Sequence, residues 1–448
     1  MSATMKAQLQ QQLTIPKIKT IPWQQQDQIT QTLLIKGQGV ADITLHENLN
    51  GRSYESLPEK VPLTFEIHTP NQEFGLKLDI TQSAAILYEL ISHSDFGKTG
   101  KQWQQIKVND SPLAGIDADP NCPYWFSIDG PNNRVSYGKG EMRQCTTLLT
   151  FQLPDKLNEE QKLKEDQLKD VKAITIHTLA TQPTFELWRE PVTIDPSLIV
   201  VDSNALSMID LASNAATVAA NLTPACQTIY ANISGNNFVL NTEDFPYFTD
   251  AIEQSIRDPE GWCYKKLREK AEHESFGGED ALKGTYLRIT MGVNQGNSPG
   301  IPNVLEIWPP GHHSPIHNHG HANAIIRVLH GEIQVDLYAM LSTKHTTPFA
   351  SQTFKKDQVT WLSPGLNQTH KLTNANLSGP TCMTIQSYLY GKDNNVHYEY
   401  FDFIDESAGV IEPFTPNSDM GFIQFKQTMK EEWLQRNTPH SCCNEPKL

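Results

Sequence analysis

The sequence lacks long apolar runs and is poor in cysteine, and both absences narrow its class. No segment reaches the roughly 18 consecutive apolar residues of a membrane-spanning helix. The start, MSATMKAQLQQQLTIPKIK, has no continuous apolar stretch like those of secretory signals. The seven cysteines are scattered without a CxxC pair, which disfavours a disulfide framework or a zinc knuckle. We therefore expect a cytoplasmic location, with the C-terminal Pro-Lys-Leu as a weak peroxisomal alternative.

Positive charge is also scarce. The chain carries 36 Lys and Arg against 51 Asp and Glu, a formal net charge of −15. Proteins that bind nucleic acid through its phosphates need clustered basic residues, so we expect no nucleic-acid partner, and no membrane partner either. The 448 residues exceed one ordinary core and predict two or three domains.

Composition along the chain suggests how those domains are arranged. Residues 1–28 are Gln-rich and are expected to be loosely ordered. Residues 29–153 alternate apolar and polar positions between Gly, Pro, Asn and Asp turns, which is typical of a β-sandwich or jelly roll. A connector with helices and strands is expected over 154–240, a second domain over 241–436, and a tail over 437–448.

Helices and strands inside these regions follow from periodicity. The charged, Pro-free segment 155–171 predicts a solvated helix, and apolar spacings of three and four predict helices over 205–223 and 244–275. From about 285 to 404 the pattern is β-rich again, and a short helix is expected over 420–436. The predicted fold class is therefore mainly β, with an N-terminal β-sandwich, a helical connector, and helices leading into a second β domain.

The stretch SPIHNHGHAN, residues 314–323, carries His317, His319 and His321 at alternate positions. On a strand, residues i and i+2 face the same side, so His317 and His319 would point at one location. A third histidine, His370, follows a Pro-Gly turn in VTWLSPGLNQTHKLTN. Two strands delivering three imidazoles predict a metal site, and imidazole suits iron, zinc, copper and nickel.

Other histidines fit this site less well. His321 follows Gly320, where the strand is expected to bend, and it stays open as a ligand or a neighbour of one. His312 and His313 precede the motif in a Pro-rich loop and are expected to be exposed.

The spacing around these histidines resembles a known superfamily. Gly311, five residues, His317-x-His319, eleven residues and Gly331 are similar to the first cupin motif, and His370 with Asn374 resembles the end of the second. The zone after His319 lacks the glutamate of ordinary cupins.

A three-histidine set of this kind resembles the cysteine dioxygenase family, as do Tyr286-x-Arg288 and Tyr390 over roughly residues 245–405. The resemblance implies a cupin jelly-roll β-barrel with Fe(2+) held by His317, His319 and His370.

The resemblance also implies a reaction. A small-molecule thiol and O2 would react to give a sulfinate, with Arg288 and Tyr286 binding the substrate and Tyr390 acting at the active site. L-Cysteine is the expected substrate, and a 3-mercaptopropionate-type thiol is the alternative. Arg288 lies in an apolar strand, and a buried arginine needs an anion, which is either the substrate carboxylate or a structural ion pair. The alternative for Tyr286 is an ordinary strand aromatic.

Two departures keep other functions open. Ala324 stands where mammalian-type members carry a cysteine that is cross-linked to the tyrosine. The family's Ser-x-His-x-Tyr run appears here as Gln386-Ser387-Tyr388-Leu389-Tyr390, with Tyr388 in place of the histidine and as a candidate catalytic residue beside Tyr390. A three-histidine cupin that acts on a non-thiol substrate is one alternative. A non-catalytic metal-containing binding or sensor protein is another.

In the N-terminal region, PYWFSIDGPNNRVSYGKGE (123–141) resembles the β-sandwich domain named after farnesoic acid O-methyltransferase. The resemblance implies a packing or homo-oligomer contact, or a module that binds a carbohydrate or lipid-like ligand. Trp103, Tyr124 and Trp125 are candidate stacking residues or core residues.

Overall fold

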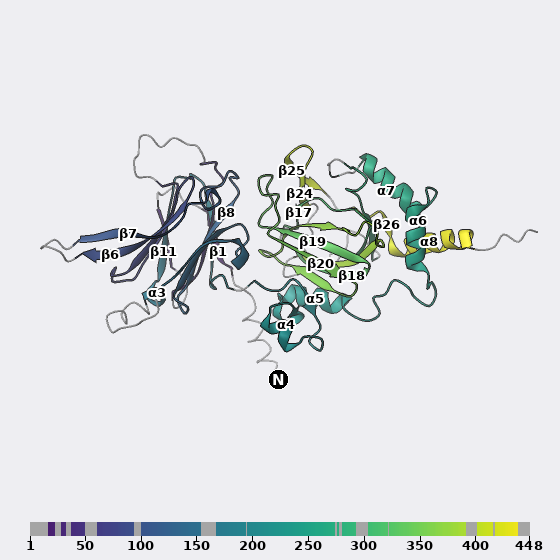
Figure 1. The fold of residues 1–448 in the computed structure, drawn as a ribbon, viewed down its shortest axis with the longest axis horizontal. Helices are drawn as coiled ribbons and strands as arrows, with labels where there is room; N and C mark the ends of the chain where they lie inside the picture. Colours follow the sequence, from purple (N-terminus) through teal and green to yellow (C-terminus); the bar gives the residue numbers. More distant parts are fainter. Residues whose placement is uncertain are drawn as a thin grey trace, which may run out of the picture. The chain divides into compact units, whose positions relative to one another are not determined.

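The computed structural model contains two compact units, Met1–Asp195 and Pro196–Leu448. The described residues are 17–22, 28–32, 37–49, 61–93, 100–153, 167–193, 195–273, 276, 280–292, 303–320, 322–390, 401–414 and 417–437. Figure 1 labels the main elements of each unit. No helix among these residues is long and apolar enough to cross a membrane.

The N-terminal unit holds two six-stranded sheets. The first has the order β1 (Lys17–Pro22), β12 (Thr184–Trp188), β3 (Gln38–Thr44), β8 (Pro123–Asp129), β9 (Arg134–Lys139), β10 (Thr147–Gln152). The second has the order β2 (Gln28–Thr32), β11 (Ala173–Thr178), β4 (Leu63–His68), β5 (Gly75–Ile80), β6 (Ala85–His93), β7 (Gly100–Asn109). Short helical turns lie at η1 (Pro112–Ala114), η2 (Gln144–Thr146) and α3 (Gln167–Asp170).

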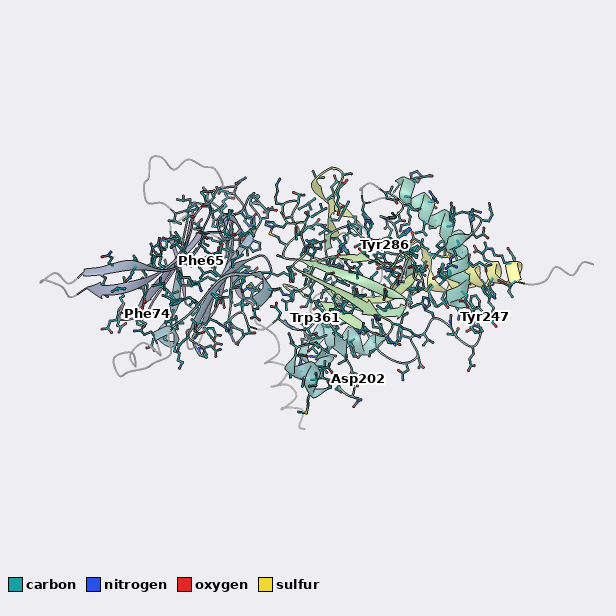
Figure 2. All side chains as sticks on the ribbon, viewed as in Figure 1. Phe65, Phe74, Asp202, Tyr247, Tyr286 and Trp361 are labelled. Carbon is teal, nitrogen blue, oxygen red and sulfur yellow. The ribbon has the colours of Figure 1, made fainter. Side chains whose placement is uncertain are left out.

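Aromatic residues join the two sheets of this unit into a sandwich. Phe65 on β4 stacks on Phe126 on β8 with ring centroids 5.6 Å apart, and Figure 2 shows Phe65 among the strands. Trp125 and Tyr124 are buried core residues, and the Tyr124 hydroxyl accepts a hydrogen bond from the Asp117 amide. Of the three candidate stacking residues, only Trp103 is partly exposed. The predicted β-sandwich is confirmed.

The sandwich extends beyond the boundaries expected from sequence. β11 and β12 come from the predicted connector, yet β11 pairs with β2 and β4, and β12 pairs with β1 and β3. β1 belongs to the segment expected to be loosely ordered. The division between units therefore lies after Asp195 rather than near residue 153. Most of the predicted helix over 155–171 lies outside the described residues, and α3 is its described part.

The C-terminal unit contains an eight-stranded and a six-stranded sheet. The larger has the order β14 (Thr217–Val218), β13 (Val200–Val201), β21 (Val359–Leu362), β18 (Ala322–His330), β23 (Cys382–Tyr390), β16 (Asn303–Trp308), β15 (Leu287–Met291), β26 (Met420–Gly421). The smaller has the order β20 (Ala350–Lys355), β19 (Glu332–Tyr338), β22 (Thr369–Thr373), β17 (His317–Asn318), β24 (Phe401–Asp405), β25 (Val410–Phe414).

The two sheets of this unit enclose a shared interior, as a cupin barrel requires. A buried cluster joins Trp308 and Ile326 of the larger sheet to Val335 and Leu372 of the smaller one. Gly331 makes the predicted turn between β18 and β19, with φ at +70°, and a Cβ there would lie 2.9 Å from the Thr381 carbonyl oxygen. The mainly β fold class, with a jelly-roll barrel in the C-terminal unit, is confirmed.

Helices cover the outer face of the larger sheet. They are α5 (Pro224–Ile233), α6 (Phe248–Arg257), α7 (Trp262–His273) and α8 (Phe422–Asn437), and Figure 1 shows α5 beside β18. Their apolar residues form one core with alternate residues of the strands, including Leu305 and Ile385. Because side chains alternate along a strand, the residues in between face the barrel interior.

The predicted helix over 205–223 is interrupted. Ser207 caps α4 (Met208–Ala212), and the chain then turns at Asn214, whose φ is +53°. β14 and the turn η3 (Ala219–Asn221) follow, and Thr223 caps α5, with Pro224 at its first position. The predicted helix over 244–275 is present as α6 and α7, and the predicted helix over 420–436 as α8.

Candidate metal centre

His317, His319 and His370 come together inside the barrel. Each offers a ring nitrogen, and the three nitrogens lie within 4.8 Å of one another. Strand register explains the convergence, because His317 on β17 is directly opposite His370 on β22. His319 follows two residues later on the same side, just before Gly320, whose φ is +58°.

Hydrogen bonds orient two of the three imidazoles. The His317 Nδ1 lies 3.0 Å from the Pro315 carbonyl oxygen, and the His319 Nδ1 lies 3.3 Å from the Gln368 carbonyl oxygen. Carbonyls only accept, so each Nδ1 carries the hydrogen and each Nε2 keeps a free lone pair. Gln368 is held in turn, since its side-chain amide donates to the Ala322 carbonyl oxygen at 2.8 Å.

Burial keeps these imidazoles neutral. It lowers the pKa of His317 to about 4, where the positive charge of Arg288 also acts. Burial and the neighbouring histidines lower the pKa of His319 and His370 well below their usual range. Neutral imidazole is the form that binds metal, so the three groups are ready to act as ligands near pH 7.

The donor set fits a metal ion. The His370 Nε2 is buried and has no hydrogen-bond partner among the described residues. A buried polar atom without a partner is costly, and a bound cation would satisfy this one. Three imidazole nitrogens and no acidic ligand are the only grouped metal-ligand donors in the described part of the chain.

Arg288 lies in the same interior, on β15. Its side chain is 9% exposed, and its Nε is 3.5 Å from Oε1 of Glu306, its partner across β15 and β16. The guanidinium makes no hydrogen bond to any described residue. Asp419 fixes the strand, because its carboxylate accepts from the Arg288 amide at 2.7 Å and pairs with Lys270 at 3.0 Å. The buried Arg288 guanidinium thus lies beside the Glu306 carboxyl and makes no hydrogen bond to the described residues, and its role as an anion clamp stays a prediction.

Glu306 is the main residue that sequence reasoning missed. Its side chain is buried, and burial, the first cause, raises its pKa to about 7 despite Arg288 and Lys270. Gln386 donates to its second oxygen, and the Tyr388 hydroxyl donates to the Gln386 carbonyl oxygen. A lone acid in the apolar run NVLEIW was a usable signal, but pairing it with Arg288 required the strand register.

Tyr388 and Tyr390 share this interior face of β23. The Tyr388 ring stacks on that of His319, with centroids 5.9 Å apart, so the chain of contacts from Arg288 ends at a metal-ligand candidate. The rings of Tyr388 and Tyr390 are 6.4 Å apart. Ala324 on β18 is opposite Tyr388, and it belongs to the same buried cluster as Tyr390.

Tyr286 is the remaining tyrosine candidate. It is buried and stacks on Trp308, with ring centroids 4.1 Å apart, and belongs to the core cluster between the sheets. Burial, and to a smaller extent the negative charge of Glu306, raise the pKa of the Tyr286 phenol. Figure 2 labels it within the C-terminal unit. This packing favours the strand-aromatic interpretation.

Phenylalanines close the site on the side of β24 and β25, which sequence reasoning also missed. The ring centroid of Phe401 is 4.7 Å from that of His319, and the centroid of Phe414 is 6.0 Å from that of His317. Phe403 and Phe276 pack edge-to-face on Phe414. The motifs that revealed the histidines end at Asn374, before β24 and β25 begin, so they gave no signal for these phenylalanines.

The outcomes for the remaining histidines differ. The expectation that His312 is exposed was wrong: it is buried, and its Nδ1 lies 2.7 Å from the Thr285 carbonyl oxygen, which ties the loop to the start of β15. His313 is partly buried. His321 lies outside the described residues. Asn374 is buried and structural, donating to the Trp308 and Pro380 carbonyl oxygens.

Comparison with known families agrees with this geometry. Residues 268–383 match the family described as cysteine dioxygenase type I. That range contains the three histidines, Arg288 and Tyr286, and ends before Tyr388 and Tyr390. It covers less than half of the chain. Together, the match and the three-histidine cluster support a metal-dependent oxidoreductase of the cupin type. Nothing in this match concerns the N-terminal unit, so its resemblance to the farnesoic acid O-methyltransferase-type domain stays a prediction.

Part of the chain is also similar to solved structures, of which three follow. One is the Cupin_2 domain of an XRE family transcriptional regulator from Enterobacter cloacae, at 13% identity over 24% of this chain and 97% of that chain, with a TM-score of 0.19. Another is a Cupin 2 conserved barrel domain protein from Salinispora arenicola, at 15% identity over 24% and 77%, with a TM-score of 0.19. The third is an oxalate oxidase in complex with glycolate, at 19% identity over 27% and 57%, with a TM-score of 0.20. Scores this low carry no functional argument.

Proposed function

We propose that this protein is a non-haem iron thiol dioxygenase that converts L-cysteine or a similar small thiol carboxylate into its sulfinate. In the balanced reaction, R–SH and O2 give R–SO2H: both oxygen atoms join the sulfur, which loses four electrons to O2. The observation that carries the proposal is a buried arginine with unused hydrogen-bond donors in the same barrel interior as three convergent imidazoles.

His317, His319 and His370 would hold Fe(2+) through their Nε2 atoms. When bound, iron activates O2 and favours the thiolate form of the substrate. The protein's own part is to fix the ligands, and the carbonyls of Pro315 and Gln368 do this for two of them.

Arg288 would bind the substrate carboxylate through a two-pronged hydrogen bond. Holding the carboxylate places the thiol at a fixed position relative to the histidines, which raises the effective concentration of the reacting groups. Tyr390, on the same face of β23, would donate a hydrogen bond to the bound thiol or its oxygens. The Tyr388 hydroxyl donates to the Gln386 side-chain oxygen instead and would help to shape the wall of the site beside the thiol. Phe401 and Phe414 limit water near the histidines, which strengthens every charge interaction in the site.

The test is oxygen consumption by the full-length protein after anaerobic loading with Fe(2+). L-Cysteine, 3-mercaptopropionate and cysteamine would be supplied separately, with sulfinate measured by mass spectrometry. We expect equal moles of oxygen consumed and sulfinate formed. His370→Ala should remove both the iron and the activity, whereas His273→Ala, an exposed histidine on α7, should change neither.

A second candidate is metal-dependent oxidation of a non-thiol substrate. The hydrogen-bonded chain Tyr388–Gln386–Glu306 favours it, because this chain places a carboxyl group on one wall of the barrel interior. Bound iron without thiol-driven oxygen uptake would overturn the first proposal and support this one.

A further inference from the structure

Glu306 is a buried carboxyl group that has no part in the proposed dioxygenase reaction. It lies on β16 opposite Arg288 on β15, and its Oε1 is 3.5 Å from the Arg288 Nε. Both side chains are more than nine-tenths buried. The two groups attract each other without a hydrogen bond between Nε and Oε1, so a ligand carboxylate on the guanidinium would lie beside this carboxyl group.

Gln386 keeps the Glu306 carboxyl group from turning away. The Gln386 amide donates to Oε2 of Glu306, and the Tyr388 hydroxyl donates to the Gln386 side-chain oxygen. Both of these residues lie on β23, which pairs directly with β16. Oε1 therefore stays directed toward Arg288 when a ligand arrives.

Charged and titratable groups from several elements surround this pair. They are Arg288 and Tyr286 of β15, Tyr388 and Tyr390 of β23, Lys270 of α7, and Asp419 just before β26. Lys270 and Asp419 form an ion pair of their own at 3.0 Å, and burial raises the pKa of the Tyr286 and Tyr388 phenols, which keeps them uncharged. Burial also raises the pKa of Glu306 to about 7, so its carboxyl group changes charge near neutral pH.

We infer that Glu306 takes up one proton from the solvent when a carboxylate ligand binds Arg288, and that it then donates a hydrogen bond to this ligand. Glu306 acts as a positioning residue, because its O–H group and the guanidinium hold the same carboxylate. One O–H bond forms on Oε1, and no electrons are transferred. The inference deepens the proposed function and rests on it in one respect, namely that Arg288 binds the substrate carboxylate.

Repulsion between like charges explains the proton uptake. Two carboxylates that share one buried site cannot both stay ionised, so one of them binds a proton. At an effective dielectric constant of about 20, a second negative charge about 4 Å away raises the proton affinity of a carboxylate by roughly 10²-fold or more.

The hydrogen bonds decide which carboxylate is protonated. The ligand would accept hydrogen bonds from the guanidinium, and these favour its ionised form. Glu306 has no such bond from the Arg288 Nε, and its one donor among the described residues is the neutral Gln386 amide. The proton therefore goes to Glu306.

Proton uptake makes binding depend on pH with a defined sign. The complex holds more protons than the free protein wherever free Glu306 is ionised, which is above about pH 7. The affinity for a carboxylate should therefore fall by up to about tenfold for each pH unit above that value, and the profile should flatten below it. A carboxyl group that only neutralises Arg288 for folding gives no such slope.

Calorimetry counts the protons directly. Full-length, metal-free protein is titrated with propionate at about pH 8 in phosphate and in Tris, whose heats of ionisation differ, and the difference in binding heat gives the number of protons taken up. We expect close to one proton per bound propionate in the wild type and close to none in Glu306→Gln. Glu272→Gln, the same change at an exposed position on α7, should keep the wild-type value.

Two further measurements keep the test decisive if Glu306→Gln folds poorly because Arg288 is left unpaired. The pH dependence of propionate binding needs no variant, and a flat profile from about pH 7 to about pH 9 overturns the inference, as does a lack of propionate binding. Glu306→Asp keeps a carboxyl group and should retain the proton uptake. Difference infrared spectra with isotope-labelled propionate should show a protonated carboxyl band of the protein that appears on binding.

A thiol carboxylate separates this inference from the proposed function. On protein loaded with Fe(2+) under argon, 3-mercaptopropionate should release its thiol proton as the sulfur becomes a thiolate, while Glu306 takes one proton up. We expect no net proton exchange in the wild type and release of one proton in Glu306→Gln. Release of one proton in both proteins overturns the inference and leaves the dioxygenase standing. Uptake of one proton in the wild type and none in Glu306→Gln means that the sulfur stays a thiol, which overturns the dioxygenase and keeps the inference.

Discussion

The two faces of the larger sheet of the C-terminal unit differ although the same strands build both. On β15, β16 and β23 the outward residues Leu287, Leu305 and Ile385 join the apolar core beneath the helices. Their immediate neighbours on the inward face are Arg288, Glu306 and Gln386, which are polar and linked to one another. Neighbouring residues of one strand therefore have different roles: one stabilises the fold and the next lines the site.

The difference between the two faces shows how the barrel can stay folded with charged side chains buried at its centre. Burying an arginine and a carboxylate stabilises little and often destabilises. The outward face buries large apolar side chains, each contributing about 1.5–3 kcal/mol relative to exposure. Substitution of an inward residue should therefore lower mainly the activity, and substitution of its outward neighbour should lower mainly the free energy of unfolding.

The largest expected effect is from Arg288→Gln. Losing one partner of a buried charge interaction costs about 2–5 kcal/mol, so kcat/KM for L-cysteine should fall by about 10²-fold or more. Iron content should stay unchanged, because Arg288 is not a ligand candidate. Steady-state oxygen uptake and metal analysis measure the two quantities. Unchanged kcat/KM would show that the carboxylate binds elsewhere.

Leu305→Ala, one residue before Glu306 on the other face, should act on stability instead. Leu305 is fully buried against the helices, and such a truncation costs about 2–5 kcal/mol. Hydrogen exchange of β16 and β23 in the full-length protein should accelerate accordingly. The ratio of Kd values for L-cysteine and 3-mercaptopropionate should stay the same, and a shifted ratio would contradict the separation of faces.

The histidines of the metal-free barrel predict a dependence of stability on pH. The pKa of His317 is lowered from 6.5 to about 4. Between these values the unfolded chain binds more protons than the folded one, so the free energy of unfolding falls as the pH falls through this window. His317→Gln removes one such group and should reduce that loss by up to about 1.4 kcal/mol per pH unit. Urea titrations read by hydrogen exchange of β22 at several pH values measure the slope, and equal slopes would refute the assignment.

The smallest effect is expected from Tyr388→Phe. The variant leaves the Gln386 carbonyl without its donor, a cost of about 1–3 kcal/mol for a buried acceptor. Selectivity should loosen, with about tenfold or less change in kcat/KM, while the ring stack on His319 persists. Tyr247→Phe, on an exposed tyrosine of the same unit, is the matched control. A complete loss of activity in Tyr388→Phe would instead point to a direct role of the phenol in the reaction.

The sequence revealed local features of the site and, through the family resemblance, the distant third histidine His370, but it missed the contacts set by strand register. Alternation aligned His317 with His319, and Gly331 marked the turn after β18, because both depend on neighbouring residues. The pairing of Arg288 with Glu306 depends on register between two strands, which no local pattern specifies. The same limit explains the displaced domain boundary, since β11 and β12 return to sheets that began about 150 residues earlier.

The division of the site between two sheets has an evolutionary consequence. His317 and His370 belong to strands of the smaller sheet, whereas Arg288, Glu306 and Gln386 belong to the larger one. A descendant gene could therefore acquire a new substrate through changes in three strands that contribute no metal ligand. The reverse also holds, because a change of metal need not alter the residues that recognise the substrate.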